Sequence, residues 1–199
     1  MSLLRCSAVI LALLLSFSSI ANEIEATETP SPVPLLLSAA GDYSIGLHTR
    51  WLEDPLARLS PDDALRADGW QVSQDESLNF GFSNSAFWLQ TLVRSTELTY
   101  WNLWIRYSLL DLTELWLCPL PVSSAADCRY QQSGDLQPFS TNRTVDHPNV
   151  IIPVTLQPQQ DYALLMRLQT QGTFQIPASI VDNDTLQDKL LANNILRGG

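Results

Sequence analysis

The sequence has few of the residues that catalytic and metal sites are built from. It contains only two histidines, His48 and His147, which lie far apart beside turn residues and are interpreted as solvated or structural. No Gly-x-Ser-x-Gly elbow, phosphate-binding loop or dinucleotide fingerprint occurs. Paired carboxylates for glycoside hydrolysis come from distant strands, and no pair stands out here. The sequence therefore predicts no enzyme, no metal site and no cofactor.

Basic residues are also scarce, with 11 Lys and Arg against 21 Asp and Glu and a net charge of −10. A surface of this charge argues against binding nucleic acid, or an anionic membrane, through general electrostatics. The acidic run Asp182-Asn183-Asp184 lacks the spacing of a defined calcium loop. It is interpreted as a cap or turn ahead of the last helix.

One long apolar run occurs at the N-terminus, from Ala8 to Phe17, behind the single positive charge of Arg5. Ser19-Ile20-Ala21 then supplies the small residues that signal peptidase reads. Residues 1–21 are predicted to be a secretory signal peptide, since the run is short for a membrane span. An uncleaved N-terminal anchor is the alternative.

Cysteine is limited to three residues, and removal of the signal peptide takes Cys6 away. The remaining pair, Cys118 and Cys128, lies in a chain destined for an oxidising compartment, where close pairs form disulfides. The predicted bond closes a hairpin around the loop from Pro119 to Asp127. Two cysteines with two distant histidines do not have a zinc-site spacing.

The chain divides into four predicted parts. Residues 22–34 are acidic and rich in Thr and Pro, which indicates a flexible leader after the signal peptide. Residues 35–183 form one domain. Residues 184–199 begin with helical spacing of leucines and are predicted to be a terminal helix or linker towards a membrane region.

A short helix is predicted early in the domain. Ser60 is a favourable N-cap, Pro61 suits the first helical position, and Asp62 and Asp63 place acids in the first turn. Gly69 is expected to stop it.

From Ser85 onward the hydrophobic period is two, which indicates β-strands. The predicted strands are Phe87–Arg94, Trp101–Leu109, Leu112–Cys118, Val150–Leu156, Tyr162–Thr170 and Phe174–Val181. Pro153 and Pro177 should place two of these at edges or bulges. Short strands at regular spacing, separated by turn residues, predict an all-β antiparallel sandwich with a short N-terminal and a C-terminal helix.

Three tryptophans fall on the polar parity of their strands. Each lies two residues from a polar partner, giving the pairs Trp88 with Gln90, Trp104 with Arg106, and Trp116 with Glu114. Arg167 lies outward on a later strand. If these strands are neighbours in one sheet, the face is a candidate site for a saccharide, which stacks on aromatic rings. The alternative is a face covered by the region from Leu35 to Gly69, with the tryptophans partly buried.

The stretches "RWLEDPLARLSPDDAL" and "LNFGFSNSAFWLQTLV" resemble the type-2 extracellular sensory domain of bacterial seven-transmembrane receptors with diverse intracellular signalling modules (the 7TMR-DISM family). "YWNLWIRYSLLDLTELWL" and "NVIIPVTLQPQQDYALLMRLQT" resemble its later strands. The matching motifs are Leu52–Pro55, Pro61–Arg66, Gly81-Phe82 and Trp88-Leu89. The similarity covers roughly Tyr43 to Val181.

The resemblance implies a jelly-roll sandwich similar to carbohydrate-binding modules. It also implies a periplasmic sensor that precedes a seven-helix membrane region, with a diguanylate cyclase or histidine kinase as output module. Members often carry Arg where this chain has Gln90, which puts an arginine-dependent contact there in doubt. Because the chain stops at Gly199, where the first membrane helix is expected, it is interpreted as a fragment or a truncated gene product.

The sequence thus favours a non-enzymatic periplasmic sensor domain, membrane-tethered within a longer receptor, that binds a saccharide or similar small polar ligand. The alternative is an interaction module that binds another protein or forms a homodimer and has no small ligand. A hydrolase is the third and least favoured hypothesis.

Overall fold

A computed structural model describes residues 33–133 and 149–197 of the chain, and for 194–197 the backbone alone. The predicted signal peptide (1–21), nearly all of the predicted leader (22–34) and His147 lie outside the described residues.

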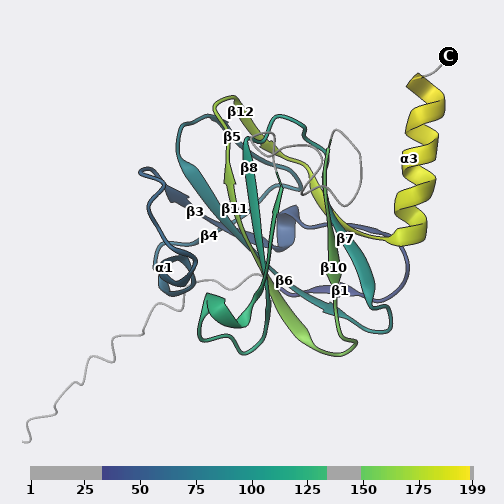
Figure 1. The fold of residues 1–199 in the computed structure, drawn as a ribbon, viewed down its shortest axis with the longest axis horizontal. Coiled ribbons are helices and arrows are strands. Elements are labelled where there is room, and N and C mark those ends of the chain that lie inside the picture. The colour runs from purple at the N-terminus through teal and green to yellow at the C-terminus, as the bar shows by residue number, and fades with distance from the viewer. Residues whose placement is uncertain (1–32, 134–148, 198–199) are drawn as a thin grey trace, which may run out of the picture.

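Two β-sheets pack face to face and a short third sheet completes the described fold (Figure 1). The larger sheet has the order β4 (Gln71–Val72), β3 (Thr49–Asp54), β6 (Ala86–Ser95), β11 (Asp161–Gln169), β8 (Leu112–Pro119) and β9 (Arg129–Ser133), with β1 (Leu35–Leu37) parallel to the end of β6. The second sheet has the order β10 (Val150–Thr155), β7 (Tyr100–Ile105), β13 (Ala178–Asp182) and β2 (Asp42–Ser44). β12 (Thr173–Ile176) pairs with β5 (Leu78–Phe82).

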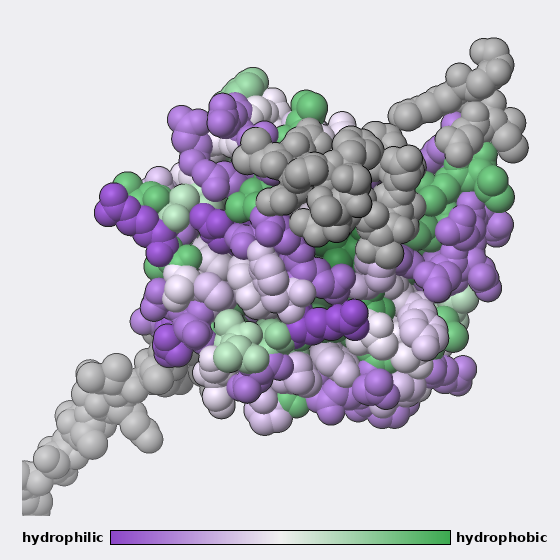
Figure 2. All heavy atoms as spheres, in the orientation of Figure 1, coloured by the Kyte–Doolittle hydropathy of each residue, from purple (hydrophilic) through white to green (hydrophobic). Residues whose placement is uncertain are grey.

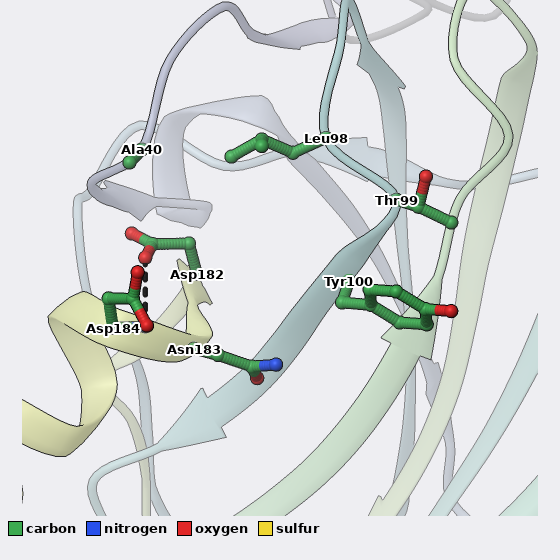
Figure 3. A pocket seen from close by; sticks show the side chains of 7 residues that line it. All are labelled: Ala40, Leu98, Thr99, Tyr100, Asp182, Asn183 and Asp184. Carbon is green, nitrogen blue, oxygen red and sulfur yellow. Dashed lines mark hydrogen bonds between the residues drawn. The ribbon is translucent and has the colours of Figure 1, made fainter.

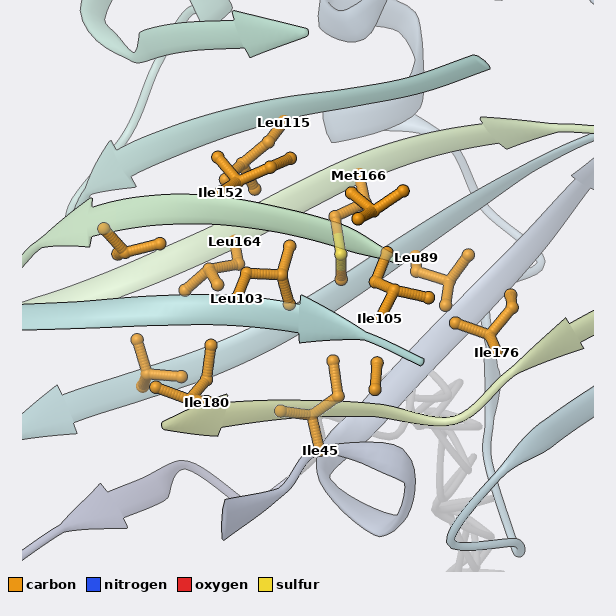
Figure 4. Close-up of a cluster of buried hydrophobic side chains, with 14 of the residues drawn as sticks. Ile45, Leu89, Leu103, Ile105, Leu115, Ile152, Leu164, Met166, Ile176 and Ile180 are labelled. Atoms are coloured by element: carbon orange, nitrogen blue, oxygen red, sulfur yellow. The ribbon is translucent and has the colours of Figure 1, made fainter. Parts of the chain in front are cut away.

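The main core lies between the inner faces of the two sheets. Alternate residues along each strand point inward, as the pleat of a strand requires. Leu89, Leu115, Leu164 and Met166 from the larger sheet meet side chains of the second sheet, among them Leu103, Ile105, Ile152 and Ile180 (Figure 4). All are at most 3% exposed. The predicted all-β antiparallel sandwich is confirmed.

The short helix α1 (Pro61–Arg66) begins as predicted, with Ser60 as its N-cap. The Ser60 hydroxyl accepts a hydrogen bond from the Asp63 amide at 3.1 Å, and the Asp63 carboxylate accepts one from the Ser60 amide, which completes a capping box. The helix is followed by Trp70, whose indole N–H donates to the Ala64 carbonyl at 3.2 Å. This bond fixes Trp70 against the outer side of the larger sheet.

The predicted strand Trp101–Leu109 is wrong at its end, because β7 stops at Ile105. Both strands that pair with β7 have their first residue opposite Ile105, so no strand is left to pair with the residues after it. These first residues are Val150 of β10 and Ala178 of β13. Leu110 turns back into the main core.

The predicted strand Phe174–Val181 is divided at Pro177 into β12 and β13, which belong to different sheets. Proline has no amide hydrogen to donate to a ladder, so it suits this crossing point. Pro153 lies in β10, an edge strand, as expected. The C-terminal helix is confirmed as α3 (Asn183–Arg197), on the side of the sandwich away from α1 (Figure 1).

The predicted disulfide between Cys118 and Cys128 is confirmed. It ties the end of β8 to the short 3-10 helix η2 (Ala125–Asp127), whose Ala125 amide donates to the Asp62 carboxylate of α1 at 2.8 Å. The disulfide loop and α1 thus form one covering layer.

Replacing both bonded cysteines by alanine should lower the free energy of unfolding by about 2–3 kcal/mol, because the bond restricts the unfolded chain. Urea denaturation followed by tryptophan fluorescence measures this as a lower midpoint. A reductant should lower the midpoint of the native chain to that of the variant and leave the variant unchanged. An unchanged midpoint on reduction would contradict a stabilising role for the bond.

Candidate functional site

The predicted ligand residues divide between the two sheets. Five of them lie on the outer face of the larger sheet, in the adjacent strands β6, β11 and β8: Trp88, Gln90, Arg167, Glu114 and Trp116. Arg167 pairs with Trp88 on one side and Glu114 on the other, which makes one row across the sheet. Trp104 and Arg106 belong to the second sheet and the turn after it. The candidate face required the strands of Trp88, Trp104 and Trp116 to be neighbours in one sheet. The strand of Trp104 lies in the other sheet, so Trp104 and Arg106 are not part of this face.

Trp88 is fully buried, at 0% exposure, so the covered-face alternative holds at this residue. It lies in a second apolar cluster outside the larger sheet, and its ring centroid is 5.5 Å from that of Trp116. The cover comes from α1, Trp70 and the disulfide loop at Ala125. Trp88 therefore packs beneath the surface of this face, and a ligand cannot reach its side chain in this structure.

The open part of the face lies towards the edge strand β9. Trp116 is 8% exposed, but the neighbouring Tyr130 is 48% exposed, with its ring centroid 5.1 Å from that of Trp116. The Tyr130 hydroxyl lies 2.9 Å from a Glu114 oxygen and 3.1 Å from the side-chain oxygen of Gln132. We call Glu114, Trp116, Tyr130, Gln132 and Arg167 the β8–β9 face.

Tyr130 and Gln132 were not among the predicted residues. Tyr130 could have been identified from the predicted disulfide, because a disulfide between the two strands of a hairpin, next to its loop, fixes which residues face each other. With Cys118 opposite Cys128, the residue opposite Trp116 is Tyr130, as the structure shows.

An ion pair lies beside the exposed ring. Arg167 Nη1 donates to Glu114 Oε2 at 2.9 Å, and both side chains are largely buried, at 17% and 16% exposure. Arg167 Nη2 donates to the Ala57 carbonyl at 3.3 Å, while its Nε has no partner within the described part of the chain. Partial burial first, and then the hydrogen bond to Glu114, raise the pKa of Tyr130 to about 12.

Gln90 lies deeper on the same face and is held by an arginine from the next strand. Arg50 of β3 is opposite Gln90 in the register, and its Nε donates to Gln90 Oε1 at 2.7 Å. The Arg50 guanidinium lies 4.8 Å above the centre of the Trp70 ring. A guanidinium is therefore present next to Gln90, although it comes from a residue that the sequence did not single out.

The second outer face is covered by α3. Trp104 packs with Ile151 and Val181 of its sheet and with Leu186 and Leu190 of the helix. The Arg106 guanidinium lies 4.7 Å above the centre of the Trp104 ring. These two predicted residues thus lie at the contact between the sandwich and its C-terminal helix.

The acidic run before α3 acts as the predicted cap. Asp182 Oδ1 accepts the amides of Asp184 and Thr185 at 3.0 and 3.1 Å, and Oδ2 accepts the amide of Gly41 at 2.6 Å. Partial burial acts to raise the pKa of Asp182, but these hydrogen bonds outweigh it and the net shift is downward. Asp182, Asn183 and Asp184 line a pocket of about 260 Å³ together with Ala40, Leu98, Thr99 and Tyr100 (Figure 3).

Residues 33–133 and 149–197 contain no group of three or more His, Cys, Asp or Glu side chains placed to hold a metal ion. Over the same two ranges, no helix combines the length and apolar character needed to cross a membrane.

The fold and these faces define a β-sandwich domain with aromatic and polar side chains gathered on its sheet surfaces. A family model described as 7TMR-DISM extracellular 2 matches residues 46–182, and the chain belongs to this family. The resemblance seen in the sequence is thereby confirmed, and it makes the chain an extracellular sensory domain of a membrane receptor. No curated protein matches the chain.

The raised pKa of Tyr130 predicts a pH effect on stability. Because the folded state holds the phenol proton more tightly than the ordinary pKa of 10.0, this contribution is complete below about pH 10 and is lost as the pH rises towards about 12. Ultraviolet absorbance titration should show one late-ionising tyrosine that Tyr130→Phe removes. Glu114→Gln should lower its pKa, since it removes the carboxylate. A late tyrosine that persists in Tyr130→Phe would show that the assignment is wrong.

Proposed function

We propose that the chain is the periplasmic ligand-sensing domain of a bacterial transmembrane signalling receptor, and that it binds a carbohydrate or similar small polar ligand on the β8–β9 face. The observation that carries the proposal is the half-exposed Tyr130 ring, which is backed by Trp116 and flanked by the Glu114–Arg167 ion pair. In this proposal the domain has no catalytic activity of its own.

The chemistry of the face suits a sugar ring. Carbohydrate C–H groups pack on an aromatic ring, and hydroxyls need charged or amide groups at its rim. Glu114 and Gln132 offer acceptor oxygens, and Arg167 offers N–H donors beside the Tyr130 ring. These side chains already hold one another in place, so little freedom is lost on binding.

Two of the residues predicted from sequence, Trp88 and Gln90, take supporting roles in this proposal. Trp88 fills the space behind Trp116, and Gln90 anchors Arg50, which in turn covers Trp70. A ligand on the β8–β9 face thus contacts a surface that is stiffened by the cluster beneath it.

Signalling requires that the ligand prefer one receptor conformation, because a ligand that binds two states equally shifts neither. β13 continues into α3 without an intervening loop, from Asp182 to Asn183. In the proposed receptor, α3 leads towards the seven-helix membrane region and an output module such as a diguanylate cyclase or histidine kinase. Differences in sandwich packing then reach the membrane through this helix.

The test is calorimetric titration of the full chain with a panel of neutral and acidic glycans. Tyr130→Ala should weaken binding about tenfold or more, since it removes the stacking surface and a hydroxyl. Tyr100→Ala is the matched control, because Tyr100 is 66% exposed on the second sheet. Equal losses in both variants would refute the assignment of the face.

Absence of heat across the whole panel would instead favour the interaction-module alternative. Light scattering at increasing concentration checks this, because that alternative expects a homodimer or another protein partner. On the face of the molecule that Figure 2 draws, hydrophobic residues form separate patches among hydrophilic ones. Leu191 of α3, at 60% exposure, is a site where such a contact can be tested by substitution with Glu.

A further inference from the structure

One end of the sandwich is built from segments without charged residues, in a chain of which 16% of the residues are charged. Three segments meet there: the end of β5, the turn between β7 and β8, and the turn between β11 and β12. They belong to residues 77–93, 107–110 and 168–181, which contain no Asp, Glu, Lys or Arg. We call Phe82, Leu109 and residues 170–173 the uncharged tip.

Strand pairing and hydrogen bonds hold these three segments together. Thr173 of β12 pairs with Phe82 of β5. The Tyr107 hydroxyl donates to the Thr173 carbonyl, and the Thr170 hydroxyl donates to the Leu109 carbonyl at 2.7 Å. Phe82 and Leu109 therefore belong to one connected surface, although they are far apart in the sequence.

The backbone of β5 turns the Phe82 ring out of the molecule. Two residues earlier, Phe80 stacks on Phe87 with the ring centroids 4.0 Å apart. Regular alternation would place Phe82 on the same side of the strand as Phe80. Gly81 breaks the alternation with a φ of +66°, and the pairing with β12 shifts its register beside it. At 84% exposure, Phe82 is the most exposed large hydrophobic side chain of the described residues.

Single exposed apolar side chains are common on soluble proteins and need no explanation. Here a phenylalanine and a leucine, at 84% and 58% exposure, share a surface without charged groups. The charged residues that border it are engaged: Arg106 donates to the Ser179 hydroxyl at 2.9 Å, and Asp111 accepts the Gln171 amide at 2.8 Å. This end can therefore leave water without uncovering an unpaired charge, in a chain with a net charge of −10.

The uncharged tip lies at the end of the molecule towards which α3 runs. After β13 ends at Asp182, the helix runs beside the second sheet, and its C-terminal end reaches the upper side of the view, where β5 and β12 lie (Figure 1). In the same orientation, hydrophobic residues stand out at this upper end (Figure 2). In the proposed receptor α3 leads to the membrane region, so this end faces the bilayer.

We propose that the uncharged tip contacts the lipid surface of the membrane that the receptor spans, with Phe82 and Leu109 in the interfacial layer. Phenylalanine and leucine side chains bind in this layer, whereas carboxylates remain in water. Two side chains bury little area, but a domain tethered beside a membrane meets it at a high effective concentration. The contact gives the sandwich a second point of support besides α3. This inference rests on the receptor assignment of the proposed function and does not depend on glycan binding.

The test uses the chain from Asn22 onward, which keeps every residue that the structure describes. This start removes Cys6, which would react with a thiol dye, and the N-terminal apolar run, which would bind lipid by itself. Urea denaturation should give this chain the midpoint of the full chain. A C-terminal polyhistidine tag then holds it on phosphatidylcholine vesicles that contain a nickel-chelating lipid, so that the end of α3 is next to the bilayer.

An environment-sensitive dye is placed on Phe82→Cys or Leu109→Cys, since the remaining native cysteines are bonded to each other. Tyr100→Cys is the matched control, because Tyr100 is 66% exposed and begins β7 at the end away from the tip. On vesicles, the dye emission at positions 82 and 109 should shift to shorter wavelength and be quenched by brominated lipid. Neither change should occur at position 100.

Phe82→Ser in the chain labelled at position 109 should weaken the lipid contact about tenfold, because it removes the ring that the interface buries. Tyr100→Ser should leave the contact unchanged. Since the Phe82 ring is exposed in the free protein, Phe82→Ser should keep the urea midpoint, which separates loss of contact from loss of folding.

Three results would overturn the inference. They are no quenching at position 82, equal quenching at positions 82 and 100, or a shift at position 82 that grows with protein concentration without vesicles, which would assign the tip to a second copy. Quenching with no glycan binding removes only the proposed ligand. Glycan binding without quenching removes only the lipid contact, so the two failures are distinguishable.

Discussion

The pairing of β11 with both β6 and β8 is the interaction on which the rest of the structure depends. β11 is buried on both sides: Leu164 and Met166 face the main core, and Ala163 and Leu165 face the cluster around Trp88. Its register sets Arg167 between Trp88 and Glu114. The same strand therefore supports two apolar layers and aligns the ion pair of the β8–β9 face.

Much of this arrangement could be predicted from the sequence, because a hydrophobic pattern with a period of two residues assigns each side chain to one face of its strand. Parity placed Trp88, Trp104 and Trp116 outward correctly, but it could not tell which sheet each strand joins. That depends on long-range pairing, and β7 pairs with β10 and β13. The burial of Trp88 likewise depends on α1 and the disulfide loop. Both segments lie more than 20 residues from Trp88 in the chain, so the pattern of its own strand does not show that they cover it.

The two outer faces of the sandwich differ in kind. The larger sheet is covered by short segments that leave its β8–β9 edge open, with Tyr130 exposed. The second sheet is covered by one long helix that meets it through Trp104, Leu186 and Leu190. On the larger sheet, the open β8–β9 edge thus lies beside the covering segments. On the second sheet, the covering helix α3 directly continues one of the sheet's own strands, β13.

The bond between the Ala125 amide and Asp62 joins segments 63 residues apart in the chain. During synthesis the N-terminal helix is made well before β8 and the disulfide loop. The layer over Trp88 therefore cannot close until the later hairpin has arrived. β11 (Asp161–Gln169) is made later still, and the sheet beneath this layer requires it, so the sheet and its cover are completed only after both segments have been made.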